Sequence, residues 1–244
     1  MDKVKEYSKN LKDYFIETSN IDVIDPATLS VILNATRSLE KNSDSGKVWD
    51  LCLDRPILLH PKHKAISEIE IFFKILAKGQ NKLKILDYQI EMKLWSDKRK
   101  YAYRYDWDSV YVRDYFDMYG KRVLARYHFD IKKKEAEIAE PFYHFHAGGR
   151  HTHREICWVP KQLAEPRFPL PPFDLILFFE FVFLNFFRRE TEDFRKKPEW
   201  VGIVRNSQNI FQRGYFENCL KFLDEPTNTL LGHSTLFKFS DEDN

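Results

Sequence analysis

The chain is poor in cysteine, and its three cysteines, Cys52, Cys157 and Cys219, show no CxxC spacing. Their odd number and wide separation exclude a disulfide scaffold and fit a reducing compartment. Glycine is scarce too, with 8 residues, and the net charge is only +2. No global field therefore draws the chain to nucleic acid or to an anionic membrane. We expect a cytoplasmic protein whose contacts with any nucleic acid come from a local patch.

A long hydrophobic run is also missing. The most apolar stretch is residues 173–187, and Glu180 and Asn185 interrupt it. A membrane-spanning helix needs about 20 mainly apolar residues, so we expect a core helix here. The N-terminus carries alternating charges and lacks the apolar region of a signal peptide. We therefore expect no contact with a membrane.

What the chain does have is enough apolar material for a core, with 43% hydrophobic and 16% aromatic residues. We expect a single domain over 1–244. Its N-terminal flank, 1–60, is predicted to be helical, and so is its C-terminal part, 172–225. An antiparallel sheet is predicted over 66–160. The acidic end of the chain, 238–244, is predicted to be disordered.

Local patterns place the helices within these regions. Residues 1–18 carry an apolar stripe at helical spacing. A second helix is predicted from Pro26 to about residue 39, since proline is favoured at the first helical position. Residues 41–47 are typical of a loop, and 207–223 of a further helix. Asp174 precedes the apolar helix, where a carboxylate complements the helix dipole.

Period-two alternation of apolar and polar residues dominates 83–147 and indicates strands. The alternating segments are 83–95, 100–107, 122–131 and 142–147. Short turns between them predict an antiparallel meander of about four to five strands. Residues 66–78 alternate at first and then become an apolar run, which leaves a strand or a short helix open. The expected class is α+β, with the meander packed on the phenylalanine-rich helix and its neighbours.

If these strands are neighbours, their polar faces share one surface. The predicted catalytic residues on it are His144, His146, His128, Arg126, Glu91 and Lys93. Asp87, Arg104, Asp106 and Asp130 are predicted to share that face. Mixed charge is also ordinary on a solvated sheet face, and that interpretation stays open. Histidine, however, is a rare choice for solubility alone.

A metal site is the first functional interpretation of the histidines. Half of the eight lie within ten residues: His144, His146, His151 and His153. A His-X-His step on a strand places both rings on one face, and neutral imidazoles bind first-row metals well. His144 and His146, with His128 from a neighbouring strand, are the predicted ligands of a divalent metal such as Zn, Mn or Mg. Glu91 or Asp106 could complete the set instead. Whether the second pair joins them is left open.

A second interpretation needs no metal. His144 or His146 would act as a general acid or base while Arg126 or Lys93 holds a phosphate. The Gly148-Gly149 link could bring backbone N–H groups close to an anion. Such an arrangement suits phosphodiester cleavage in RNA or DNA.

Glu91-X-Lys93 on a strand also resembles one tripeptide of the PD-(D/E)XK nucleases, in which carboxylates hold Mg and the lysine assists the water. The chain departs from that family, because Asp87 lies only four residues before Glu91 on the same strand. The resemblance covers the tripeptide alone.

Over residues 83–149, which end in "HFHAGG", the chain resembles small uncharacterised prokaryotic proteins such as the TumE-type toxins of toxin–antitoxin pairs. Those also have a short meander, rich in Tyr, Arg and Asp, that closes on a histidine-rich strand. The chain differs in its Gly-Gly turn, its phenylalanine-rich helix and its helical flanks, and no family active site carries over residue by residue.

The resemblance implies a prokaryotic defence or toxin–antitoxin setting, with nucleic acid or a protein encoded in the same locus as the partner. Two functions are therefore predicted. One is a nuclease or phosphodiesterase that depends on histidine or on a metal. The other is a non-catalytic subunit that binds protein or nucleic acid within a larger assembly.

Overall fold

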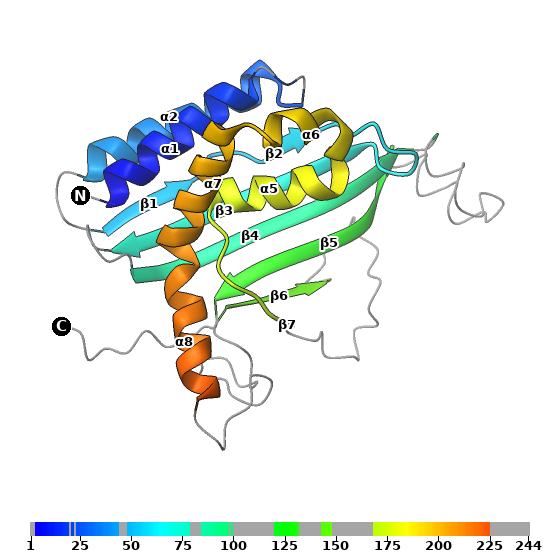
Figure 1. Cartoon of the computed structure of the whole chain (residues 1–244). Helices are drawn as coiled ribbons and strands as arrows, with labels where there is room; N and C mark the ends of the chain where they lie inside the picture. Colours follow the sequence, from blue (N-terminus) through cyan, green and yellow to red (C-terminus); the bar gives the residue numbers. More distant parts are fainter. Residues whose placement is uncertain are drawn as a thin grey trace.

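The fold is a long antiparallel sheet with helices packed on one of its faces, as Figure 1 shows. The predicted α+β class is confirmed. The computed structural model describes residues 3–19, 21, 23–43, 48–78, 84–97, 99, 120–131, 143–147 and 168–224. The predicted strand 100–107 and the tail 238–244 lie outside these ranges.

The sheet has seven strands in the described part of the chain. They are β1 (Val48–Cys52), β2 (Ile57–Leu59), β3 (Glu68–Lys78), β4 (Lys84–Asp97), β5 (Lys121–Ile131), β6 (Tyr143–Ala147) and β7 (Phe168–Pro169). Their order is β1-β3-β4-β5-β6-β7, and β2 pairs with β3 as well. Each pairing is antiparallel. The segment 66–78, left open between strand and helix, therefore contains the strand β3.

Alternation turns one face of the sheet toward the helices. On β4, Tyr88, Ile90, Met92 and Leu94 are buried on that face, as predicted. The start of β4 departs from the prediction, because the register between β3 and β4 shifts at Leu76/Ala77. The shift leaves Leu86 exposed and gives its expected buried place to Ile85.

The helices are α1 (Lys3–Thr18), α2 (Pro26–Ser43), α5 (Leu175–Phe186), α6 (Arg188–Arg195), α7 (Pro198–Phe211) and α8 (Arg213–Leu223). The predicted stripe of α1 is buried, with Tyr7, Leu11, Tyr14 and Phe15 fully enclosed. Asp174 caps α5, since its carboxylate accepts the backbone N–H of Leu177 at 2.9 Å. These helices close the core against the sheet (Figure 1).

Aromatic side chains fill the space between the sheet and the helices. Phe129 of β5 packs edge-on against Phe178 of α5, with ring centroids 5.5 Å apart. Phe15 of α1 meets Phe179 of α5 in the same way at 5.0 Å. Burying each such ring stabilises the fold by roughly 1.5–3 kcal/mol, which explains why α5 is apolar almost all round.

Three boundaries predicted from the sequence are wrong. The flank 1–60 is not all helical, because β1 and β2 lie within it. These strands have only five and three residues, which is too short for alternation to stand out. The helix α2 continues to Ser43, into the predicted loop 41–47. The predicted helix 207–223 is two helices, α7 and α8, that meet at Gln212, whose side chain donates to the carbonyl of Pro172 at 3.3 Å.

Candidate metal centre

The predicted site residues lie together on the face of the sheet that turns away from the helices. Cross-strand pairing aligns Glu91 of β4 with His128 of β5, and His128 with His146 of β6. His144 faces Asp130 one pair further along. Neighbouring side chains on one face of such a ladder lie about 5 Å apart at their Cβ atoms. The sheet thus gathers groups that are far apart in the sequence.

The three histidines are buried, although no described helix packs on their side of the sheet. His128 is 8% exposed, His144 4% and His146 6%. The rings of His128 and His146 stack at a centroid distance of 5.0 Å, with 10° between their planes.

Three side chains in this region could hold a metal ion: His128, Asp130 and His146. Their ligand atoms lie within 4.8 Å of one another, and Nε2 of His146 is 3.8 Å from Oδ2 of Asp130. A tetrahedral ion with bonds of about 2.1 Å spaces its ligands about 3.4 Å apart. Small side-chain rotations would therefore close the group around an ion.

The surroundings of His128 keep its imidazole neutral, which is the form that binds a metal ion. Burial lowers its pKa to about 4, and the positive charge of Arg126 acts in the same direction. Glu91 and Asp130 oppose these effects without overcoming them. His128 is therefore neutral at physiological pH and offers a lone pair, as metal coordination requires. Its Nε2 is buried and has no hydrogen-bond partner among the described residues.

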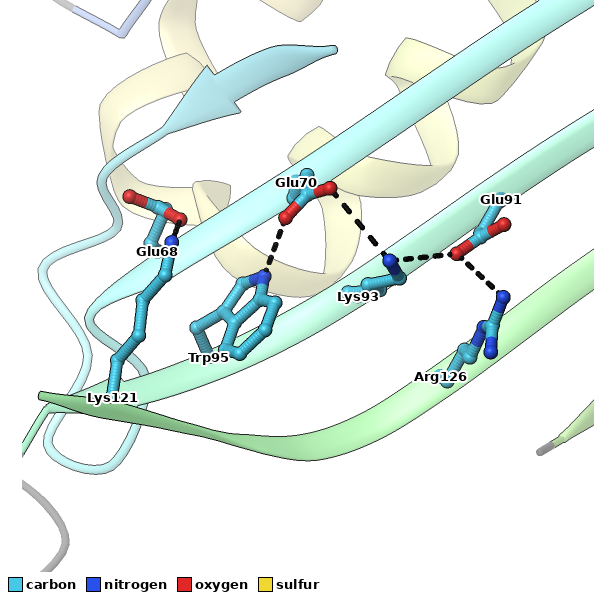
Figure 2. Close-up of polar contacts among 7 residues, drawn as sticks. All are labelled: Glu68, Glu70, Glu91, Lys93, Trp95, Lys121 and Arg126. Carbon is cyan, nitrogen blue, oxygen red and sulfur yellow. Dashed lines mark hydrogen bonds and ion pairs between the residues drawn. The ribbon is translucent and has the colours of Figure 1, made fainter. Parts of the chain in front are cut away.

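Next to the histidines runs a ladder of alternating charges, Glu70–Lys93–Glu91–Arg126, which Figure 2 shows across β3, β4 and β5. Oε1 of Glu91 lies 2.9 Å from the guanidinium of Arg126 and 3.1 Å from Nζ of Lys93. Lys93 also approaches Glu70, at 3.8 Å. Burial raises the pKa of Glu91, but the hydrogen bonds and charges of Arg126 and Lys93 outweigh it, and the pKa is lowered. Glu91 is thus held as a carboxylate between two cations.

At the far end of the same face, Lys121 pairs with Glu68 at 2.6 Å, and its ammonium lies 4.5 Å from the Trp95 ring centroid (Figure 2). The Trp95 indole donates to Glu70 at 2.8 Å. A register shift at Leu94/Trp95 brings Lys121 onto this face. Together these contacts continue the ladder away from the histidines.

All six predicted catalytic residues lie in this one region: His144, His146, His128, Arg126, Glu91 and Lys93. Asp130 was not among the predicted ligands. The group that could hold a metal contains Asp130, whereas the predicted set had His144 in its place. The sequence did contain a signal for Asp130. It lies two residues after His128 on the same strand, and such residues share one face of a sheet. His151, His153, Gly148, Gly149 and Asp106 lie outside the described residues.

Fold and site together define an α+β protein with a candidate metal centre on the face of its sheet opposite the helices. No family model, curated protein or solved structure matches this chain. The resemblance to TumE-type toxins therefore stays a prediction. Among the described helices, none has the length and apolar character to cross a membrane.

Proposed function

We propose that this protein is a metal-dependent hydrolase that holds a first-row transition metal, with Zn²⁺ the first choice, between His128, Asp130 and His146. The observation that supports it is the convergence of two imidazoles and one carboxylate, with all ligand atoms within 4.8 Å. Imidazole donors favour Zn, Fe, Ni or Cu over Mg, which prefers oxygen ligands. Of the predicted ions, Zn therefore fits this donor set better than Mg.

The number of ligands favours catalysis over a purely structural site. Structural zinc sites are usually closed by four protein ligands, whereas catalytic ones use three and leave a position for water. A zinc ion in such a site lowers the pKa of its bound water to about 7 and so supplies hydroxide at neutral pH. In this chain Asp130 and His146 would hold the ion, and neutral His128 would complete the set.

Metal content is the first test. Purified protein should contain close to one equivalent of metal, measured for Zn and for Fe because non-haem iron enzymes use the same donor set. Asp130→Asn should lower metal affinity by more than the roughly 10- to 100-fold typical of losing a residue that only orients a ligand, since it removes the anionic ligand itself. Asp87→Asn is the matched control. Asp87 lies on the same strand face as Glu91 but pairs with Lys74 at 2.7 Å, away from the histidines.

Two results would overturn the proposal. One is a protein that binds neither Zn²⁺ nor Fe²⁺ when dialysed against them. The other is equal metal affinity in Asp130→Asn, Asp87→Asn and the wild type. A protein that binds metal but hydrolyses no ester, amide or phosphodiester substrate would support the predicted alternative of a non-catalytic subunit.

Nucleic acid as substrate and a prokaryotic defence or toxin–antitoxin setting remain predictions from the sequence. The described charges add no positive surface beside the site, because Glu70 and Glu91 balance Lys93 and Arg126. Any preference for an anionic substrate must therefore come from the site itself.

A further inference from the structure

We propose that the metal centre binds a phosphate or phosphate ester as its exogenous ligand, held between the ion and the guanidinium of Arg126. This inference rests on the proposed metal site and names its substrate class. The charge of the metal centre favours an anionic ligand. A divalent ion held by two neutral imidazoles and one carboxylate keeps a net charge of about +1. An anion in the open coordination position would neutralise it.

Arg126 lies next to the proposed metal centre. It lies two residues before His128 on β5, on the same face of the sheet, which is a separation of about 7 Å along a strand. Its guanidinium is 2.9 Å from Glu91, the residue of β4 that pairs with His128. An anion bound to the ion would lie within reach of this guanidinium.

The ladder of alternating charges fixes Arg126 in place. Glu91 holds the guanidinium at 2.9 Å and is itself held by Lys93 at 3.1 Å (Figure 2). The side chains of Arg126, Glu91 and Lys93 are only 13–16% exposed. A planar guanidinium matches the oxygens of a phosphate better than an ammonium does. Glu91 thus acts as a positioning residue for Arg126.

The same geometry predicts that Arg126 has opposite effects on the two ligands. Its positive charge repels the metal ion and attracts the phosphate. Arg126→Gln should therefore raise Zn²⁺ affinity, by about tenfold or less after screening. The same substitution should lower phosphate affinity by about 10- to 100-fold. Loss of folding alone would weaken both, so opposite signs separate the proposed role from a structural one.

The experiment is calorimetric titration of the full chain, first with Zn²⁺ and then, after removal of excess metal, with inorganic phosphate, dimethyl phosphate and acetate. The wild type loaded with Zn²⁺ should bind the two phosphates at least about tenfold more tightly than acetate, and more tightly than the metal-free protein does. Lys121→Gln is the matched control. It removes a cation of the same face that pairs with Glu68 at the far end of the ladder, and both affinities should stay unchanged.

If Arg126→Gln fails to fold, Arg126→Lys serves instead. Lysine keeps the positive charge but lacks the planar guanidinium, so Zn²⁺ affinity should stay unchanged while phosphate affinity falls. Binding of inorganic phosphate but not of dimethyl phosphate would assign the site to monoesters, and binding of both would include diesters. The inference is overturned if Zn²⁺ binds and phosphate does not, if acetate binds as tightly, or if Arg126→Gln leaves phosphate affinity unchanged. Failure to bind Zn²⁺ would instead overturn the proposed function.

Discussion

The two faces of the sheet both bury ionisable groups, but they satisfy them differently. On the helix side, Asp174 and Glu180 are 0% and 8% exposed. Asp174 accepts hydrogen bonds from Leu177 and Ser207. Glu180 accepts from Tyr14 at 3.1 Å and from Arg195 at 2.9 Å. The buried carboxylates of the helix side thus receive donors from at least two elements of the fold.

On the histidine side, a buried group is left without such hydrogen bonds from the described residues. His128 is as buried as Glu180, yet its Nε2 has no hydrogen-bond partner among the described residues. A buried polar atom left without a partner costs about 1–3 kcal/mol. Burial alone therefore does not distinguish a structural group from a functional one. The satisfied carboxylates tie helices together, whereas Nε2 of His128, without a partner in the described part of the chain, lies near a carboxylate and a second imidazole, where an ion could bind.

The largest effect is expected on the helix side. Glu180→Ala should lower the free energy of unfolding by about 3 kcal/mol or more, because it leaves Arg195 and the buried Tyr14 hydroxyl without their acceptor. Chemical denaturation measures this change. Glu192→Ala is the control, since Glu192 forms an exposed pair with Lys196, and we expect no measurable effect. Equal stability of Glu180→Ala and the wild type would show that the contacts of Glu180 with Tyr14 and Arg195 do not stabilise the fold.

Asp174 should give the helix side an unusual dependence on pH. Burial raises its pKa to about 6 against the hydrogen bonds from Ser207 and Leu177. The folded state therefore takes up this proton more readily than the unfolded state, whose pKa is about 3.9. The contribution is fully present below about pH 4 and is lost as the pH rises through about 6. Over that window it changes the free energy of unfolding by about 3 kcal/mol.

Asp174→Asn isolates this contribution, because asparagine also caps a helix but does not titrate. The free energy of unfolding of the wild type, minus that of the variant, should rise as the pH falls from about 6.5 to 4. Denaturant curves at several pH values measure that difference. A difference that falls with acid would mean that the hydrogen bonds to Asp174 outweigh its burial, so that its pKa is lowered in the folded state.

Much of this architecture was predictable from the sequence, because long strands and amphipathic helices repeat their pattern several times. The eleven residues of β5 and the sixteen of α1 are examples. The errors occurred where the pattern is short or interrupted. The strands β1 and β2 are too brief to show a period, and Leu86 lies where a register shift inverts the alternation. Register depends on pairing with another strand, so a single segment does not encode it.

The site was predictable to a similar extent. Alternation alone placed His128 and His146 on the face opposite the core, and pairing between β5 and β6 brings them together. The choice between His144 and Asp130 as the third ligand could not be made, because it depends on side-chain reach across strands. The ion pairs of Glu91 with Arg126 and Lys93 could not be predicted either. In the predicted sheet, several acidic residues lay within reach of each of these two cations.

The smallest effect, and the sharpest test of the comparison, is expected on the histidine side. In metal-free protein, His128→Phe should change the free energy of unfolding by less than about 1 kcal/mol, in the stabilising direction. The substitution removes a buried nitrogen that has no hydrogen-bond partner among the described residues, and it keeps a flat ring against His146. Adding Zn²⁺ at about 100 times its Kd should stabilise the wild type by about 2.7 kcal/mol and leave this variant unchanged.

His144→Phe is the control for this prediction. It replaces an equally buried ring outside the ligand group, so it should keep the gain in stability from Zn²⁺. If His128→Phe instead destabilised the metal-free protein as much as Glu180→Ala does, His128 would belong to the fold in the same way as the carboxylates, and the distinction between the two faces would not hold.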